Sequence, residues 1–291
     1  MTTTLRPAQP LQRNSDGTRR RAYEVRVNSR RVGTLELATR SAAQPAIGVI
    51  RGLWIDEGDR RRGRGTVAAL AAEEVLRSWR CTGVAVSVPA DAGPALRMAA
   101  ALGYRETGRV MVKELPEPPE PPAGLPAGLP AGLPAGSVGR PMTRAEFDAW
   151  LEPGIVEYGR RLTAPGMTEE QGVAASRAEH ARMLPDGPDT PGTAFLLLET
   201  PAGETLGTVW TGECELPGLG AVPYVYDIKV APEHRGQGHG RTLMLLAERT
   251  VLAAGGSRLG LHVVEGNTPA RRLYESLGYR DIAVNASKVL I

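Results

Sequence analysis

An internal repeat with a constant offset constrains the fold of this chain more than any other feature of its sequence. Gly63-Arg64-Gly65 recurs as Gly238-His239-Gly240, and Leu102-Gly103-Tyr104 recurs as Leu277-Gly278-Tyr279, in both cases 175 positions later. A constant offset leaves no insertion or deletion between the two motifs in either copy. The chain has 291 residues, enough for two cores of ordinary domain size. The sequence therefore predicts two related domains in tandem.

The C-terminal copy contains a strand, a glycine turn and a helix in succession. Residues 224–230 are apolar and β-branched, as in a buried strand, and apolar residues recur at helical spacing over residues 241–254. Between them, the glycines of residues 235–240 allow a tight turn, so that the N–H groups of the first helical turn can face a phosphate. A Walker loop needs a lysine after its last glycine and a dinucleotide fingerprint needs a third glycine, but Arg241 stands at that position. The turn therefore predicts a site for a different phosphate-bearing ligand.

A second signature follows the glycine turn. Residues 259–264 form another apolar run, and residues 267–279 then carry Asn, Ala, Leu-Tyr and Leu-Gly-Tyr in that order. Together with Arg-x-x-Gly-x-Gly over residues 235–240, this sequence resembles the GNAT acetyltransferase superfamily, which binds acetyl-CoA. The resemblance implies an α/β (α+β) fold of two tandem GNAT-like domains, each a mixed, mostly antiparallel twisted sheet flanked by helices.

The resemblance also implies a cofactor site in the C-terminal copy, with acetyl-CoA as the co-substrate. The backbone at Val230, where the fourth and fifth strands would diverge, would hydrogen-bond the pantetheine and polarise the thioester carbonyl. Amides of residues 237–241 would hold the pyrophosphate, and Asn267 would bind the pantetheine arm. The residues assigned to cofactor binding are Ile228, Val230, Arg235, Gly236, Gln237, Gly238, His239, Gly240, Arg241 and Asn267.

In this family the acceptor amine attacks the thioester directly, without an acyl-enzyme. Tyr274 would lie near the sulfur as general acid, because the pKa of a phenol suits protonation of a thiol leaving group. Asp227 is a carboxylate in an otherwise apolar strand, so it must be either partnered or functional. It is the first candidate for the base or the amine anchor, and Glu213, Glu215 and His262 are alternatives. No cluster of residues has the spacing of metal ligands.

Only the C-terminal copy has an acceptor side. The pairs Thr143–Glu146 and Thr168–Gln171 have the spacing of capping boxes and predict two helices, ending near Arg161 and near Leu184. In the GNAT family these helices and their loop cover the acceptor half of the cleft. The N-terminal copy leaves too few residues before its first hairpin for two such helices.

The N-terminal copy also lacks residues that the expected acetyl transfer needs. Ala99 stands where the C-terminal copy has Tyr274, and Arg61 stands where it has Gly236. We therefore predict a degenerate, inactive GNAT-like domain over residues 1–115. A linker rich in proline, alanine, glycine and leucine follows over residues 116–137, and a complete acetyltransferase domain spans residues 138–291. A fragment of residues 137–291 is expected to retain some catalysis.

Composition excludes several classes of function. The net charge is only +3, which demands no nucleic-acid partner, and no apolar run approaches the roughly 20 residues that span a bilayer. The N-terminus lacks the apolar stretch of a signal peptide, and Cys81 and Cys214 have no paired spacing. The preference for arginine over lysine indicates a GC-rich bacterium. These features predict a cytoplasmic protein with a small-molecule or peptide amine acceptor and no nucleic-acid or membrane partner. Homodimerisation, common in the family, stays open.

The leading hypothesis is an acetyl-CoA-dependent N-acetyltransferase whose C-terminal domain transfers acetyl to a primary amine. One alternative is a non-catalytic acetyl-CoA-binding sensor or scaffold, against which the retained Asn267 and Tyr274 argue. The other is an enzyme resembling mycothiol synthase, a tandem GNAT protein that acetylates a cysteinyl sugar amine. The shortened N-terminal copy and the long linker depart from that pattern.

Overall fold

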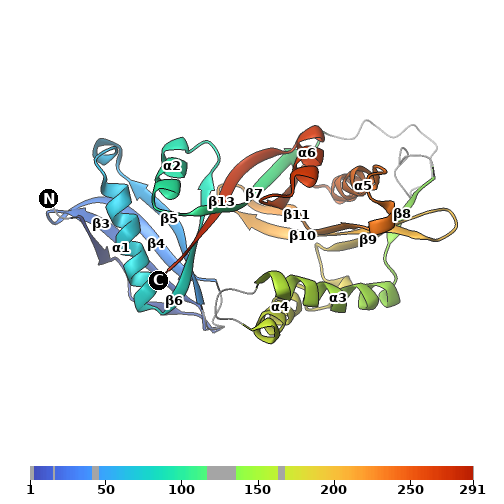
Figure 1. Cartoon of the computed structure of the whole chain (residues 1–291), viewed down its shortest axis with the longest axis horizontal. Coiled ribbons are helices and arrows are strands. Elements are labelled where there is room, and N and C mark those ends of the chain that lie inside the picture. Colours follow the sequence, from blue (N-terminus) through green and yellow to red (C-terminus); the bar gives the residue numbers. More distant parts are fainter. Residues whose placement is uncertain (1–2, 16, 41–45, 117–135, 163–167, 291) are drawn as a thin grey trace. The chain divides into compact units, whose positions relative to one another are not determined.

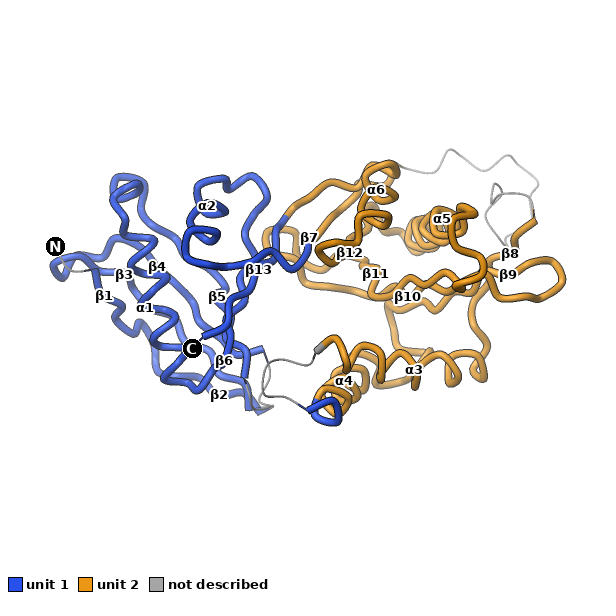
Figure 2. The backbone as a smooth tube through the Cα atoms, viewed as in Figure 1, with its two compact units in different colours: residues 1–108, 163–171, 283–291 blue, residues 109–162, 172–282 orange. Residues whose placement is uncertain are grey.

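The computed structural model describes the chain except residues 1–2, 16, 41–45, 117–135, 163–167 and 291. The chain forms two compact units (Figure 2). Unit 1 comprises residues 1–108, 163–171 and 283–291, and unit 2 comprises residues 109–162 and 172–282. Each unit is therefore assembled from stretches that lie far apart in the sequence.

Unit 1 is a mixed sheet with two α-helices. Its elements are β1 (Thr3–Pro7), β2 (Gln12–Arg13), β3 (Arg19–Val27), β4 (Arg30–Thr39), β5 (Ala46–Ile55), α1 (Arg64–Ser78), β6 (Cys81–Pro89), α2 (Gly93–Ala101) and most of β13 (Arg280–Val289). The strands lie in the order β1-β3-β4-β5-β6-β13, with β2 paired to β3. β5 and β6 run parallel, and the other pairs with a described register are antiparallel.

The two faces of the unit 1 sheet differ in character. On one face Leu37 of β4 packs in a core with Leu76 of α1. On the other face Glu36 of β4 forms an ion pair with Arg20 of β3 at 2.8 Å. No helix occurs before β3 among the residues that the structure describes, as predicted for the N-terminal copy. A charged sheet face can remain in water, so this face does not need a helical cover.

Unit 2 has the predicted sheet with helices on both faces. Its elements are most of β7 (Arg105–Glu114), β8 (Val138–Pro141), α3 (Arg144–Leu162), most of α4 (Glu169–Met183), β9 (Ala194–Glu199), β10 (Thr205–Leu216), β11 (Gly220–Val230), α5 (His239–Ala253), β12 (Arg258–Val264) and α6 (Thr268–Ser276). The strands lie in the order β7-β12-β11-β10-β9-β8. Helices α3 and α4 cover one face, and α5 and α6 cover the other (Figure 1). Within the described ranges, no helix has the length and apolar character needed to cross a membrane.

Both predicted capping boxes are formed. The Thr143 N–H donates to Glu146 Oε2 at 2.7 Å, and the Glu146 N–H donates to Thr143 Oγ1 at 3.3 Å. Thr168 and Gln171 make the same reciprocal pair at 2.9 and 3.2 Å. Each box satisfies N–H groups that a helix N-terminus would otherwise leave without a partner. The starts of α3 and α4 are therefore set by local sequence.

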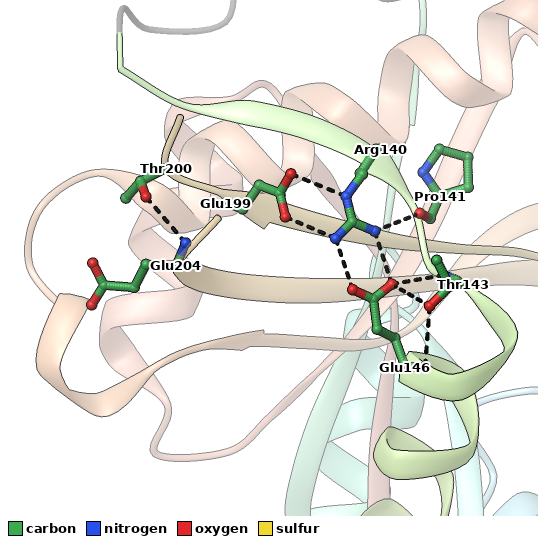
Figure 3. Close-up of polar contacts among 7 residues, drawn as sticks. All are labelled: Arg140, Pro141, Thr143, Glu146, Glu199, Thr200 and Glu204. Atoms are coloured by element: carbon green, nitrogen blue, oxygen red, sulfur yellow. Dashed lines mark hydrogen bonds and ion pairs between the residues drawn. The ribbon is translucent and has the colours of Figure 1, made fainter. Parts of the chain in front are cut away.

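Arg140 of β8 ties the first capping box to the sheet edge (Figure 3). Its guanidinium donates to Glu146 at 2.8 and 2.7 Å and to Glu199 of β9 at 3.0 and 2.8 Å. The hydrogen bonds from Arg140 and from Thr143 lower the pKa of Glu146 to about 2. The N-terminal end of α3 is therefore fixed against the β8–β9 edge.

The last strand of each half of the sequence is exchanged between the units. In unit 1, residues 283–289 of β13 pair antiparallel with residues 83–89 of β6. In unit 2, β7 lies beside β12. The exchanged strands also carry core residues, because Met111 belongs to the core of unit 2 and Ala286 to the core of unit 1.

A buried ion pair anchors each exchanged strand. Lys288 Nζ of β13 lies 2.8 Å from Glu73 Oε2 on α1, and Lys113 Nζ of β7 lies 2.7 Å from Glu248 Oε2 on α5. Both glutamates are buried. The two pairs occupy equivalent positions of the repeat, since Glu248 lies 175 residues after Glu73 and Lys288 lies 175 residues after Lys113. Removing one partner of a buried pair leaves an uncompensated charge, so each pair holds its strand in its unit.

The compact units differ from the predicted domains 1–115 and 138–291 at these strands. The predicted bounds assign β7 to the N-terminal domain and β13 to the C-terminal domain, whereas most of β7 belongs to unit 2 and most of β13 to unit 1; these two strands are called the return strands. A fragment of residues 137–291 would lack Met111 and Lys113, so the expectation that it stays active no longer follows. Most of the predicted linker 116–137 lies outside the described residues.

The exchange predicts that the two halves of the chain need each other to fold. Residues 138–291 expressed alone should be insoluble or unfolded by circular dichroism. The fragment loses Met111 and Leu115 from its core, where burial contributes about 1.5–3 kcal/mol for each side chain, and β12 becomes an open edge. Co-expression with residues 1–115 should yield a soluble pair that copurifies through a tag on one fragment.

Residues 1–104, which end before β7, are the matched control and should not rescue the C-terminal fragment. A 138–291 fragment that unfolds cooperatively on its own would contradict the exchange.

Candidate acetyl-transfer site

The two C-terminal signatures meet in unit 2 where β11 and β12 separate. The strands are parallel, and their register pairs Tyr224 with Gly260 and Val225 with Leu261. Beyond Val225 the register of β11 continues on the β10 side only. The strands therefore diverge earlier than Val230, the position expected from the sequence.

A β-bulge in β11 accompanies this divergence. Trp210 of β10 pairs with Asp227, and the next residue, Thr211, pairs with Val225. Tyr226 is therefore the extra residue, and its hydroxyl donates to the Glu213 carbonyl at 2.6 Å. A bulge bends its strand and increases the local twist, which turns the end of β11 away from β12. Sequence reasoning missed the bulge because nothing in residues 224–230 interrupts the strand pattern.

The turn between β11 and α5 has the predicted backbone. Gly236 and Gly238 have φ angles of 76° and 89°, in the left-handed region that favours glycine, and Gly238 is the N-cap of α5. A Cβ built at either glycine meets no atom within 4 Å. The outer side of the turn is therefore open. The Arg241 N–H donates to the Gly238 carbonyl at 3.0 Å, and the N–H groups of His239 and Gly240 precede this first hydrogen bond of α5. Such a turn fits the pyrophosphate of acetyl-CoA.

The side chains of this turn brace its backbone. Arg235 Nε donates to the Val230 carbonyl at 3.4 Å, and Gln237 Nε2 donates to the Glu233 carbonyl at 3.3 Å. Arg241 donates to Ser276 Oγ on α6 at 2.5 Å. His239 begins α5, and Ile228 and Val230 pack against the core of unit 2. The backbone amides, rather than these side chains, are left as the surface for a ligand.

Helix α6 brings the second signature beside the turn. Asn267 is the N-cap, and its Oδ1 accepts the Ala270 N–H at 3.3 Å. A Cβ at Gly240 would lie 3.2 Å from Leu273 Cδ2, so glycine at this position lets α5 and α6 approach closely. Asn267 therefore has a structural role as a cap, and it also lines a pocket with Arg109 of β7.

Tyr274 lies on the buried side of α6. Its side chain belongs to the core of unit 2, and the residue is only 6% exposed. Burial, with the negative charge of Asp227 as a second cause, raises the pKa of Tyr274 to about 12. The phenol is therefore protonated at neutral pH and can serve as a proton donor.

Asp227 lies on the face of β11 that α3 covers. Burial raises the pKa of its carboxyl, against the opposing charge of Lys229. Trp150 of α3 lowers the pKa of the same carboxyl, and Glu157 of α3 pairs with Lys229. A carboxyl with a raised pKa is a better proton acceptor near neutral pH. Asp227 and Tyr274 lie close enough for the charge of one to affect the other.

Trp150 and Glu157 are the site residues that sequence reasoning missed. Trp150 packs edge-on against Trp210 with ring centroids 5.7 Å apart and against Phe195 at 5.3 Å. The i, i+3 spacing of Phe147 and Trp150 marks the buried face of α3. This spacing does not show which strand the buried face of α3 will contact. The residues around Asp227 could therefore not be predicted from the sequence.

The alternative bases lie in more exposed places. Glu213, Glu215 and His262 are all exposed. A base acts on a bound amine best where water is excluded, so these exposed residues are weaker candidates than the half-buried Asp227.

The N-terminal turn keeps the backbone of the site and changes its side chains. Arg61, at the position of Gly236, has a φ of 56°, and Gly63 has a φ of 72°. Arg64 forms a buried ion pair with Asp59, which also binds Arg30 at 2.8 Å. The conformation thus survives although a non-glycine residue is strained in this region.

The reacting groups of unit 2 have no counterpart in unit 1. Gly52 stands at the position of Asp227, and Ala99 stands at the position of Tyr274. Unit 1 therefore lacks both the candidate acid and the candidate base.

Comparisons with known proteins agree with this geometry. The model of the Acetyltransferase (GNAT) family matches residues 4–104 and 165–279. A mycothiol acetyltransferase of Salinispora arenicola is 31% identical over 255 residues, which cover 82% of this chain and 72% of the relative. An uncharacterised N-acetyltransferase of Bacillus subtilis, YycN, is 28% identical over 152 residues, or 52% of this chain and 96% of the relative.

Solved structures share the fold of the whole chain. A tandem GNAT protein from the clavulanic acid biosynthesis pathway superposes with a TM-score of 0.55 at 23% identity, over 94% of this chain and 84% of its own. A GCN5-related N-acetyltransferase from Sphaerobacter thermophilus gives a TM-score of 0.57 at 20% identity, over 92% and 80% of the two chains. Family model, relatives and fold agree: this chain is a tandem member of the GNAT acetyltransferase family.

Proposed function

We propose that the protein is an acetyl-CoA-dependent N-acetyltransferase and that unit 2 transfers the acetyl group directly to a primary amine. The observation that carries the proposal is a phenol in the core of unit 2, Tyr274, whose pKa is raised by burial and by the charge of a half-buried carboxyl, Asp227 of β11. Transfer from a thioester to an amine needs a base for the ammonium and an acid for the departing thiolate. The pair supplies one group for each task.

Acetyl-CoA, when bound, supplies the acetyl group as a thioester. The amides of residues 237–241 hold its pyrophosphate at the start of α5, and the backbone from Ile228 to Val230, with Asn267, orients the pantetheine arm. Asp227 accepts a proton from the acceptor ammonium, which makes the nitrogen nucleophilic. As the nitrogen bonds to the carbonyl carbon and the C–S bond breaks, Tyr274 would donate its phenolic proton to the sulfur, and the second proton of the nitrogen would leave to solvent. Proton exchange with solvent then returns both side chains to their starting states.

The acceptor in this proposal is a small molecule with a primary amine. Carboxylates of Asp227 and Glu157 on the α3 side suit a cationic amine, and relatives named as mycothiol acetyltransferases favour a small molecule over a peptide. A reaction like that of mycothiol synthase is the second candidate function, supported by the same relatives. Neither nucleic acid nor membrane is part of the proposal. A sensor that binds acetyl-CoA without turnover is the opposing hypothesis.

Replacing Tyr274 tests the proton donor. Tyr274→Phe should lower kcat at least about tenfold, equivalent to about 1.4 kcal/mol of barrier, because the phenylalanine cannot protonate the thiolate. Acetyl-CoA affinity should stay nearly unchanged. Turnover is measured as release of CoA thiol with a panel of amino sugars, aminoacyl amides and polyamines. Tyr104→Phe, which removes a buried hydroxyl from unit 1, is the matched control, and equal rates for the two variants would remove Tyr274 from the mechanism.

Replacing Asp227 should lower activity and raise stability. Burial raises its folded-state pKa, so its contribution to stability is complete below the unfolded pKa and is lost as pH rises through the folded pKa. Asp227→Asn should therefore lower turnover at least about tenfold, a loss typical of a missing general base, while the free energy of unfolding in urea rises at neutral pH.

Glu157→Gln is a control of opposite sign for that measurement. Lys229 lowers the pKa of Glu157, so this residue contributes stability above its unfolded pKa and loses it as pH falls through the folded pKa. The variant should be less stable than wild type at neutral pH. Asp227→Asn that is both less stable and fully active would contradict the assignment of Asp227 as base.

Calorimetric titration with acetyl-CoA tests the glycine turn and counts sites. The wild-type chain should bind one molecule, Gly238→Glu should bind none, and Gly63→Glu should still bind one. Both glycines have a left-handed φ, so the two variants share the same backbone strain, and only the first places a carboxylate against the pyrophosphate. A second site that is abolished by Gly63→Glu would show that unit 1 also binds the cofactor. If the wild-type chain binds no acetyl-CoA, the proposed acetyltransferase activity is excluded.

A further inference from the structure

Lys113 is a charged residue that the exchanged strand β7 contributes to the interior of unit 2. Its Nζ lies 2.7 Å from Glu248 Oε2 on α5 and 5.8 Å from the centre of the Tyr279 ring. Its side chain is 18% exposed, and that of Glu248 is 8% exposed. The ammonium therefore neutralises a buried carboxylate and rests against an aromatic face, which cations favour.

Tyr279 in turn contacts the candidate acid. The rings of Tyr279 and Tyr274 meet edge to face, with centroids 6.1 Å apart and planes at 61°. The Tyr279 N–H also donates to the Tyr274 carbonyl at 3.0 Å. Both residues are buried in the core of unit 2. Because a packed interior does not deform freely, the position of the Tyr279 ring limits the positions open to Tyr274.

Unit 1 contains the same arrangement without the acid. Lys288 Nζ lies 2.8 Å from Glu73 and 5.7 Å from the centre of the Tyr104 ring. The Tyr104 N–H donates to the carbonyl of Ala99 at 3.0 Å, and Ala99 occupies the position of Tyr274. The molecule therefore holds two equivalent lysine–glutamate–tyrosine clusters, of which only one touches a tyrosine that can donate a proton to substrate.

We propose that Lys113 is a positioning residue for Tyr274, so that the N-terminal half of the chain completes the active site of the C-terminal half. The inference rests on the proposed role of Tyr274 as general acid. Lys113 acts through Glu248 and Tyr279 and does not itself touch the substrate. The N-terminal half of the chain then has a function of its own, because it supplies a strand and a charge to the reaction centre of unit 2.

The matched variants Lys113→Met and Lys288→Met separate positioning from stability. Each removes the ammonium of one cluster and leaves a buried glutamate without its partner, so both should lower the midpoint of urea unfolding. Lys113→Met should also lower kcat about tenfold, since a small displacement of a catalytic group is costly, with the KM for acetyl-CoA unchanged. Lys288→Met should keep the wild-type kcat. Turnover is measured with acetyl-CoA and the amine from the panel that gives the highest wild-type rate.

A double-mutant cycle with Tyr274→Phe shows whether Lys113 acts through the acid. If it does, adding Lys113→Met to Tyr274→Phe should cause no further loss of kcat, because the group that it positions is already absent. Lys113→Arg, which keeps the charge, should recover most of the rate. If the two losses multiply, or if Lys288→Met lowers kcat as much as Lys113→Met, Lys113 is structural and the inference is wrong.

A third variant distinguishes a loss of positioning from a loss of folding. Lys113→Met combined with Glu248→Gln removes both charges, which avoids an unpaired buried carboxylate. This double variant should fold and should show the same loss of kcat as Lys113→Met. Normal turnover in it would overturn the inference and leave the proposed function intact, whereas a wild-type chain without turnover on any amine would overturn both.

Discussion

Two buried lysine–glutamate pairs, one in each unit, hold the exchanged strands on which the rest of the molecule depends. Lys288 meets Glu73 in unit 1, and Lys113 meets Glu248 in unit 2. An ion pair inside a protein contributes less to stability than its geometry suggests, but a wrong partner leaves a buried charge unpaired. The pairs therefore act chiefly on register, because they fix which residues of each exchanged strand lie inside its sheet. Met111 and Ala286 then bury apolar surface at that register.

The two units share a turn geometry although unit 1 has Gly52 and Ala99 at the positions of the candidate reacting groups. In the turn of unit 1, Arg61 adopts the left-handed conformation that Gly236 has in unit 2. The ion pair between Arg64 and Asp59 holds this loop, so the loop shape no longer depends on glycine alone. Unit 1 has lost the groups that would react and has kept the sheet, the helix start and the return strand. The N-terminal half also contributes its last strand, β7, to the sheet of unit 2.

The candidate site of unit 2 depends on environment as much as on residue type. Tyr274 and Asp227 are both desolvated, which makes the phenol a firmly protonated acid and the carboxyl a stronger base. Helix α3 contacts the same strand through the ion pair of Glu157 with Lys229, two residues from Asp227. That helix is fixed in turn by the Thr143–Glu146 capping box and by Arg140 at the sheet edge. The capping box and the sheet edge that fix α3 therefore also fix the helix that lies beside the candidate base.

The sequence alone determined the repeat, the fold class, both capping boxes and the glycine turn. Each of these follows from residues near one another in the chain: a positive φ needs glycine, and a capping box needs two residues three positions apart. Only the tertiary structure decided the strand exchange and the neighbours of Asp227. Both copies carry lysine and glutamate at equivalent positions, so either return strand could satisfy either sheet, and no local signal distinguishes the two pairings. Likewise, the buried face of α3 is visible in its sequence, but the strand it covers is set by packing across residues far apart in the chain.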